Sequence, residues 1–424
     1  MGNSKSVPAM VDNWPEGDIT RARELSCVKK IEEVGTMNEP CHVPMRVLFR
    51  GLLSLFATAL LFLGLSQIAL AQSQQKWEQA LGAARQEGKV VVWGPPGELI
   101  RNAVVAGFQK AYPAITIEFT GGRGGSHAAK VKAERDGGVY SVDVMLSGTT
   151  TANIYLEPIK ALDPIEPALL LPEVTDLKYW SNHSLEFSDE SSRNNLVFVN
   201  QLKTPLIYNP NTAKIEEIDS IFELLAPKWK GKYVINDPVP SGAGNVTFRW
   251  LWRVLGPEKA TDYYRRFRAN AGAVDRDQRR QIEWIAQGKY AFAFGPSDGT
   301  MQQLLQRGLK FDVLPEFEEG SLITASFGSV MVINRAPHPN AATVFLNWIL
   351  TKEGQTIWSR AMNHHSRRLD VPQDHLPPYV IPKPGSGVYS GDPKPGDRYW
   401  ISHSAENVHR TPEETKILQE LFGR

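Results

Sequence analysis

The chain has 424 residues, of which 42% are hydrophobic and 22% are charged. This ordinary globular composition supplies a large core, and two domains are the natural expectation for such a length. The 47 lysine and arginine residues nearly balance the 46 aspartate and glutamate residues, so the charge argues against a nucleic-acid partner or an anionic membrane surface.

A secretory signal peptide is predicted at residues 45–71. The basic start Met45–Arg46 precedes an apolar run and the small-residue site Ala69–Ala71, which is the layout of a cleaved signal. A membrane anchor is the alternative, and the small-residue site disfavours it. Residues 1–44 are polar and without periodicity, so we expect an over-read or disordered extension there.

The two cysteines, Cys27 and Cys41, both precede Met45. The exported chain would therefore have no disulfide, no thiol chemistry and no cysteine for a lipid anchor. These features predict a soluble protein of an oxidising compartment, the periplasm.

Strands and helices alternate after the signal. Apolar strands are predicted at 89–93, 115–119 and 142–146, with helices at 98–112 and 126–135 between them. This βαβαβ order predicts an open, mostly parallel sheet whose ligands lie beyond the carboxyl ends of the strands.

A small, polar corner follows each of these strands. Such corners either make turns and helix caps or present N–H groups and hydroxyls to a ligand, and three in succession favour a ligand site. The candidate contacts are Trp93, Arg123, Ser126, Ser147 and Thr149. Arg123 suits a carboxylate or phosphate, and Trp93 suits a ring or a sugar.

A second region repeats this pattern between extended stretches at about 196–209 and 322–333, which are expected to cross between the two regions. Its polar corners at 240–245 and 295–299 again precede helices. Candidate ligand contacts are Ser241, Ser297 and Asp298, and Asp298 is expected to cap its helix. From Pro372 to Asp397, proline and glycine predict irregular surface chain.

The corner Gly295–Gly299 also matches the Gly-x-Ser-x-Gly elbow of serine hydrolases, which would make Ser297 a nucleophile. So short a pattern arises by chance in a glycine-rich chain, and no glycine-rich oxyanion loop accompanies it. Several histidines between His338 and His409 follow Ser297 in the sequence, but no pattern singles out one of them as the general base that a serine nucleophile needs. We expect no enzyme activity, and a secreted serine hydrolase is an alternative.

Four stretches of the chain together resemble the solute-binding proteins of bacterial ABC importers, in the branch associated with ferric iron and related small ligands. They are Pro205–Pro210, Leu225–Lys232, Ala336–Ala342 and Trp348–Gln355. The resemblance extends over nearly all of the chain after the signal. It implies an α/β fold of the two-lobe, type II periplasmic-binding-protein kind, with crossing hinge strands, a central ligand cleft that closes on binding, and delivery to an inner-membrane permease.

The resemblance also implies how the chain is divided. Lobe 1 would comprise residues 72–204, completed by about 322–362. Lobe 2 would comprise residues 205–321, with 363–424 packing as a C-terminal segment. Tyr208 lies where the chain would cross between the lobes, which makes it a hinge residue and a candidate ligand contact.

Iron-binding members of this family hold ferric iron with two neighbouring tyrosines. The only Tyr-Tyr pair here, Tyr263–Tyr264, lies in a helical, basic segment outside the corner Gly295–Gly299. His364 and His365 are adjacent and would diverge by about 100° on a helix. We therefore expect no metal and no cofactor, and a monomer that captures a small polar, anionic solute; a ferric-iron-binding protein of the same family is the alternative.

The signal prediction has a direct test. Because the small-residue site ends at Ala71, the exported protein is expected to begin at Gln72. Intact mass or N-terminal sequencing of periplasmic protein checks this. A membrane-retained chain that keeps residues 45–71 would contradict it.

Overall fold

The computed structural model describes residues 72–423, apart from 215–217, 241 and 297. The predicted signal peptide, Ser241 and Ser297 therefore lie outside the described residues. A helix at 72–87 leads into the first strand. Within the described ranges, no helix combines the length and the apolar character that crossing a membrane requires.

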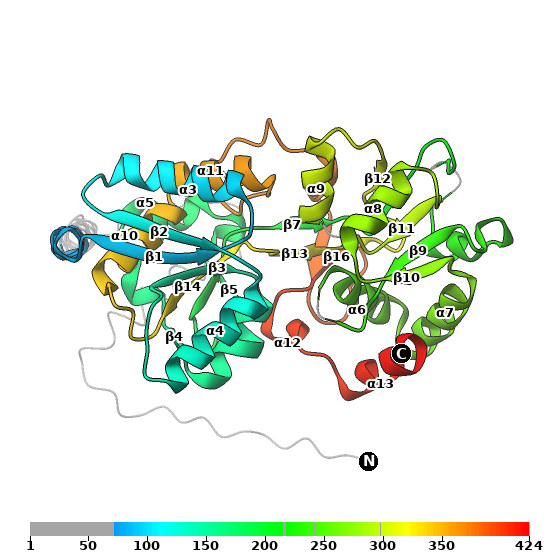
Figure 1. Ribbon diagram of the computed structural model, residues 1–424, viewed down its shortest axis with the longest axis horizontal. Coiled ribbons are helices and arrows are strands. Elements are labelled where there is room, and N and C mark those ends of the chain that lie inside the picture. Colours follow the sequence, from blue (N-terminus) through cyan, green and yellow to red (C-terminus); the bar gives the residue numbers. More distant parts are fainter. Residues whose placement is uncertain (1–71, 215–217, 241, 297, 424) are drawn as a thin grey trace, which may run out of the picture. The chain divides into compact units, whose positions relative to one another are not determined.

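The first lobe contains a seven-stranded sheet with three parallel strands side by side (Figure 1). They lie in the spatial order β2 (Thr116–Gly121), β1 (Lys89–Gly94) and β3 (Val144–Ser147). The helices α3 (Glu98–Ala111) and α4 (Gly124–Asp136) connect them, which confirms the predicted βαβαβ unit. The sheet is completed by β14 (Ser329–Ile333), β6 (Asn195–Val197), β5 (Glu186–Phe187) and β4 (Leu162–Asp163).

The second lobe contains a five-stranded sheet in the order β10-β9-β11-β8-β12. Its strands are β8 (Leu206–Tyr208), β9 (Tyr233–Asn236), β10 (Ala273–Asp275), β11 (Phe292–Phe294) and β12 (Asp312–Leu314). Its helices are α6 (Ala243–Leu255), α7 (Pro257–Asn270), α8 (Gln278–Ala286) and α9 (Asp298–Gln306). Because β9 is parallel to both β10 and β11, the carboxyl ends of these strands share one edge.

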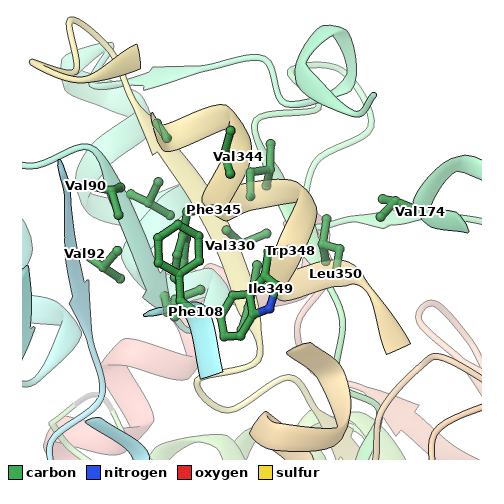
Figure 2. Close-up of a cluster of buried hydrophobic side chains, with 14 of the residues drawn as sticks. Val90, Val92, Phe108, Val174, Val330, Val344, Phe345, Trp348, Ile349 and Leu350 are labelled. Atoms are coloured by element: carbon green, nitrogen blue, oxygen red, sulfur yellow. The ribbon is translucent and has the colours of Figure 1, made fainter. Parts of the chain in front are cut away.

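Each lobe has its own apolar core. In the first, α10 (Pro339–Leu350) packs Phe345 and Trp348 against Phe108 of α3, with ring centroids 5.3 and 5.4 Å apart (Figure 2). In the second, Tyr233 stacks between Phe267 and Phe292. Aromatic rings of this size bury large apolar areas, so each sheet is held to its helices independently.

Two short antiparallel strands join the lobes. The chain leaves β6 of the first sheet, forms β7 (Gln201–Lys203) and enters β8 of the second; it returns from β12 through β13 (Ser321–Thr324) to β14. In β7 and β13, Lys203 pairs with Leu322, and Gln201 with Thr324. These strands confirm the predicted crossings.

The stretch 372–397, expected to be irregular surface chain, contains one short strand, and a second strand begins at its last residue. Two strands, β15 (Gly387–Tyr389) and β16 (Asp397–Ile401), extend the β7–β13 sheet, with β16 parallel to β13. Tyr399 and Trp400 are fully buried there. The proline and glycine content concealed β15, which pairs with the nearby β16, and the other partner of β16, β13, lies far away in the sequence.

A buried ion cluster ties this segment to the first lobe. Glu186 of β5 contacts both Arg367 and His403, and His403 follows β16 directly. The side chains of Arg367 and His403 are each only 3% exposed. Burial alone raises the pKa of Glu186, but the charges and hydrogen bonds of His403 and Arg367 outweigh it and lower that pKa to about 2.

Glu186 should therefore contribute to acid sensitivity. Its folded-state pKa is depressed from 4.5 to about 2, so its stabilisation is present above about pH 4.5 and is lost as the pH falls towards 2. We expect Glu186→Gln to lower the free energy of unfolding by about 3 kcal/mol at pH 7, and by much less near pH 2. Urea unfolding of the wild type and of Glu186→Gln across this pH range measures the loss of stability at pH 7 and near pH 2.

The matched control is the exposed pair Lys132–Asp136. The change Asp136→Asn should alter the free energy of unfolding by less than about 0.5 kcal/mol at pH 7. An equal loss at pH 7 and pH 2.5 in Glu186→Gln would show that the carboxylate charge is irrelevant.

Candidate ligand-binding site

The strands β1, β2 and β3 end at one edge of the first sheet. In the parallel register, Gly94 pairs with Gly121, and Trp93 pairs with Met145. The N–H of Gly122 donates to the carbonyl of Gly94 at 2.9 Å. The polar corners after these three strands are therefore neighbours in space.

Arg123 and Ser126 are the exposed candidates at this edge. Arg123 occupies the N-cap position of α4, and no side chain caps that helix, so N–H groups of its first turn are available to an anion. In the described part of the chain, the guanidinium of Arg123 makes neither an ion pair nor a hydrogen bond. Thr149 is 5% exposed, and its hydroxyl likewise has no protein partner among the described residues.

Trp93 and Ser147 lie beneath this edge, at 3% and 1% exposure. The hydroxyl of Ser147 lies 2.8 Å from that of Thr151. A Cβ at Gly124 would stand only 2.4 Å from Ser147 Oγ, so the helix start packs directly on these hydroxyls. Both residues thus support the corner from below, and ligand contact by them stays a prediction.

His127 completes the support of the Arg123 corner. It is 7% exposed, and its ring packs against Trp93 with centroids 5.1 Å apart. Burial lowers the pKa of His127, and the charge of Lys130 lowers it further. The imidazole is therefore neutral at pH 7, and Arg123 supplies the positive charge of this corner.

The opposing corner belongs to the edge where β9 and β11 end. The side chain of Asn236 donates to the carbonyl of Gly295 at 2.7 Å. Asp298, the first residue of α9, accepts a hydrogen bond from the Thr204 N–H at 3.2 Å and pairs with Lys203 at 3.1 Å. The carboxylate expected to cap its helix is thus held by the crossing strand.

Two further acidic side chains near this edge also have cationic partners. Asp237 lies 2.7 Å from Arg276, and Asp275 lies 2.7 Å from Arg280. Together with the Asp298 pair, these contacts compensate the negative charges. Arg123 of the first lobe is consequently the charge without a counter-ion within the described corners.

The tyrosines are placed in cores. Tyr208 of β8 is 7% exposed and pairs with Phe292 and Asp312 in the sheet. Tyr263 and Tyr264 are each 1% exposed, and burial raises their pKa values well above the usual range. A phenol with a raised pKa resists the ionisation that binding to ferric iron requires.

The described residues offer neither a metal cluster nor an evident catalytic base. Their His, Cys, Asp and Glu side chains form no cluster of three that is suited to a metal. Histidines that follow the Gly295–Gly299 motif have other partners: His338 contacts Asp143, His364 contacts Trp358, and His403 contacts Glu186.

Sequence reasoning missed Lys203, Arg276 and Arg280. Lys203 carries a signal, since it is the one charged residue of the extended stretch 196–209. Arg276 and Arg280 flank the capping residue Asp277 of α8, which accepts from the Arg280 N–H at 3.0 Å. Their ionic partners lie on strand ends that only the folded sheet brings close.

A comparison with protein families decides what kind of protein carries this fold. Residues 103–378 match the family described as bacterial extracellular solute-binding protein. The chain belongs to that family. A curated relative of this solute-binding protein is the Fe(3+)-binding periplasmic protein of Serratia marcescens, 22% identical over 305 residues that span 69% of this chain and 82% of the relative.

Solved structures share its two-lobe fold. Ferric iron-binding protein A of Mannheimia haemolytica in an open conformation has a TM-score of 0.60 at 14% identity, with 80% of this chain and 99% of that chain covered. AfuA of Actinobacillus pleuropneumoniae, bound to fructose-6-phosphate, has a TM-score of 0.56 at 17% identity, with 78% and 97% covered. The family consists of binding proteins, and nothing among these relatives supports the serine hydrolase alternative.

The close approach of α4 to its sheet gives a testable pair of variants. In Gly124→Ala the new Cβ would stand 2.1 Å from Thr151 Oγ1, whereas a Cβ at Gly125 has nothing within 4 Å. We expect Gly124→Ala to lower the free energy of unfolding by about 1–3 kcal/mol and to weaken ligand binding. Gly125→Ala should be neutral or stabilising by up to about 1 kcal/mol. Thermal unfolding measures the stability of the two variants. Equal melting temperatures for Gly124→Ala and Gly125→Ala would refute the close contact at Gly124.

Proposed function

We propose that this solute-binding protein is the periplasmic component of an ABC import system that captures a small, polar, anionic solute and delivers it to a membrane permease. The main support for this proposal is the arrangement of charges at the polar corners. Asp237, Asp275 and Asp298 are each paired with a cation, whereas Arg123 is exposed without a counter-ion in the described chain. A free guanidinium beside an uncapped helix start favours a carboxylate or a phosphate group.

The connection between the lobes supports a transport role. The corner at Ser147 adjoins the exit of β13, since a Cβ at Gly148 would stand 2.5 Å from the carbonyl oxygen of Ser326. The corner at Asp298 adjoins the end of β7 through Lys203 and Thr204. Strands of three and four residues separate these points, so a small ligand held by one corner is within reach of the other after a modest hinge rotation.

Ferric iron is the second candidate, because the Serratia relative is named for it. The neighbouring tyrosines Tyr263 and Tyr264 disfavour it here. Both are buried among apolar rings, and the Tyr263 hydroxyl donates to the carbonyl of Ile221 at 3.1 Å. The proposal therefore places an organic or inorganic anion in the site.

A ligand screen tests the proposal. Carboxylates and phosphorylated metabolites should raise the melting temperature, whereas ferric titration should give no visible phenolate-to-iron band. Arg123→Ala should weaken the stabilising anion by roughly tenfold or more, because a charge-assisted hydrogen bond is lost. Lys132→Ala, on the same helix but paired with Asp136, is the control and should bind normally. A visible phenolate-to-iron absorption band would contradict the assignment, and so would an anion that binds Arg123→Ala as tightly as it binds the wild type.

A further inference from the structure

Lys203 is a buried cation whose hydrogen-bonding capacity is fully used. It is 2% exposed, and its ammonium donates to the carbonyl oxygens of Thr204 and Pro296 and pairs with Asp298. An ammonium has three N–H donors, so these three partners satisfy it. The arrangement also fixes Asp298, whose other carboxylate oxygen accepts from the Thr204 N–H.

The pair joins the crossing strand to the second-lobe corner. Lys203 is the last residue of β7, and Pro296 and Asp298 flank the turn between β11 and α9. Folding stability alone gives a weak reason for the Lys203–Asp298 pair, because buried ion pairs can often be replaced by apolar residues without loss of stability. What the pair determines is the sign of the charge at this corner.

The effect of the Lys203–Asp298 pair on anion binding becomes clear when one partner is removed at a time. Asp298 is 9% exposed and belongs to the polar corner 295–299 of the second lobe. Without Lys203, its carboxylate would leave an uncompensated negative charge that opposes an anion. Without Asp298, the lysine would leave a positive charge that attracts one. At about 10 Å, a unit charge changes the affinity for an anion by roughly five- to tenfold.

We propose that Lys203 is a specificity-determining residue that makes the second-lobe corner accept anions by neutralising Asp298. This inference rests on the proposed function and adds its selectivity mechanism. Lys203 acts through Asp298 and is a positioning residue in this role. Because both residues are tied to β7, the compensated charge stays with the corner when the lobes move.

The test uses three variants of the full mature chain: Lys203→Met, Asp298→Asn and the double variant. The probes are inorganic phosphate, glucose 6-phosphate, citrate and succinate as anions, with glucose and putrescine as neutral and cationic probes. Calorimetry gives the dissociation constants. We expect Lys203→Met to weaken the bound anion roughly five- to tenfold and Asp298→Asn to strengthen it, with the double variant moving back towards the wild type.

Opposite signs for the two single variants separate a charge role from structural damage, which would weaken binding in both. If Lys203→Met fails to fold, Asp298→Asn and the double variant still carry the sign test. The matched control is the buried pair Arg249–Glu414, at 6% and 7% side-chain exposure. Arg249→Met should lower the melting temperature without changing the ratio of anion to glucose affinity.

Two failures are distinguishable. If the wild type binds an anion but both single variants weaken it, or leave it unchanged, the role of Lys203 is refuted and the proposed function stands. If the wild type binds putrescine or glucose and none of the anions, the proposed function and the role of Lys203 both fall.

Discussion

The antiparallel pairing of β7 with β13 is the contact on which the site depends. Each of these strands carries the chain from one sheet to the other, and their ladder holds the two crossings in a fixed register. The corner at Ser147 adjoins the β13 exit, and the corner at Asp298 adjoins the β7 end. This ladder, together with the C-terminal segment, sets the relation between the polar edges of two independently packed lobes, on which the proposed site depends.

Charge compensation is the second constraint. Carboxylates at strand ends are useful for holding helix starts and turns, yet each one would repel an anionic ligand. The chain keeps these carboxylates and places a cation on each: Lys203 on Asp298, Arg276 on Asp237 and Arg280 on Asp275. In the proposed function, selectivity for an anion rests on the guanidinium of Arg123, which has no ionic partner among the described residues, and it requires no excess of basic residues in the chain as a whole.

Local patterns in the sequence predicted the strands and helices of the first βαβαβ unit, because apolar periodicity and glycine corners are properties of neighbouring residues. The crossings were expected from the resemblance to two-lobe solute-binding proteins. Contacts between distant residues were not predictable: β16 pairs with β13, and Asp298 contacts Thr204 across 94 residues of chain as well as the neighbouring Lys203. Trp93 and Ser147 were candidates because they lie at strand ends, but only the folded chain shows that they lie under α4, Ser147 beside Gly124 and Trp93 beside His127. Periodicity carries no information on which strand end a helix covers.

The C-terminal segment adds a further link between the lobes. Tyr389 and Trp400 belong to the second core, and β16 runs parallel to β13 towards the first lobe, where His403 meets Glu186. The chain then returns: the carbonyl of His409 accepts from Arg249 of α6 at 2.6 Å, and Phe422 of α13 (Pro412–Phe422) packs in the second core. A hinge rotation that moved Glu186 away from His403 would separate a carboxylate of lowered pKa from its largely buried partners His403 and Arg367. The cost of separating them would oppose rotation at this end of the sheet, so we expect any lobe movement to follow paths that preserve the cluster.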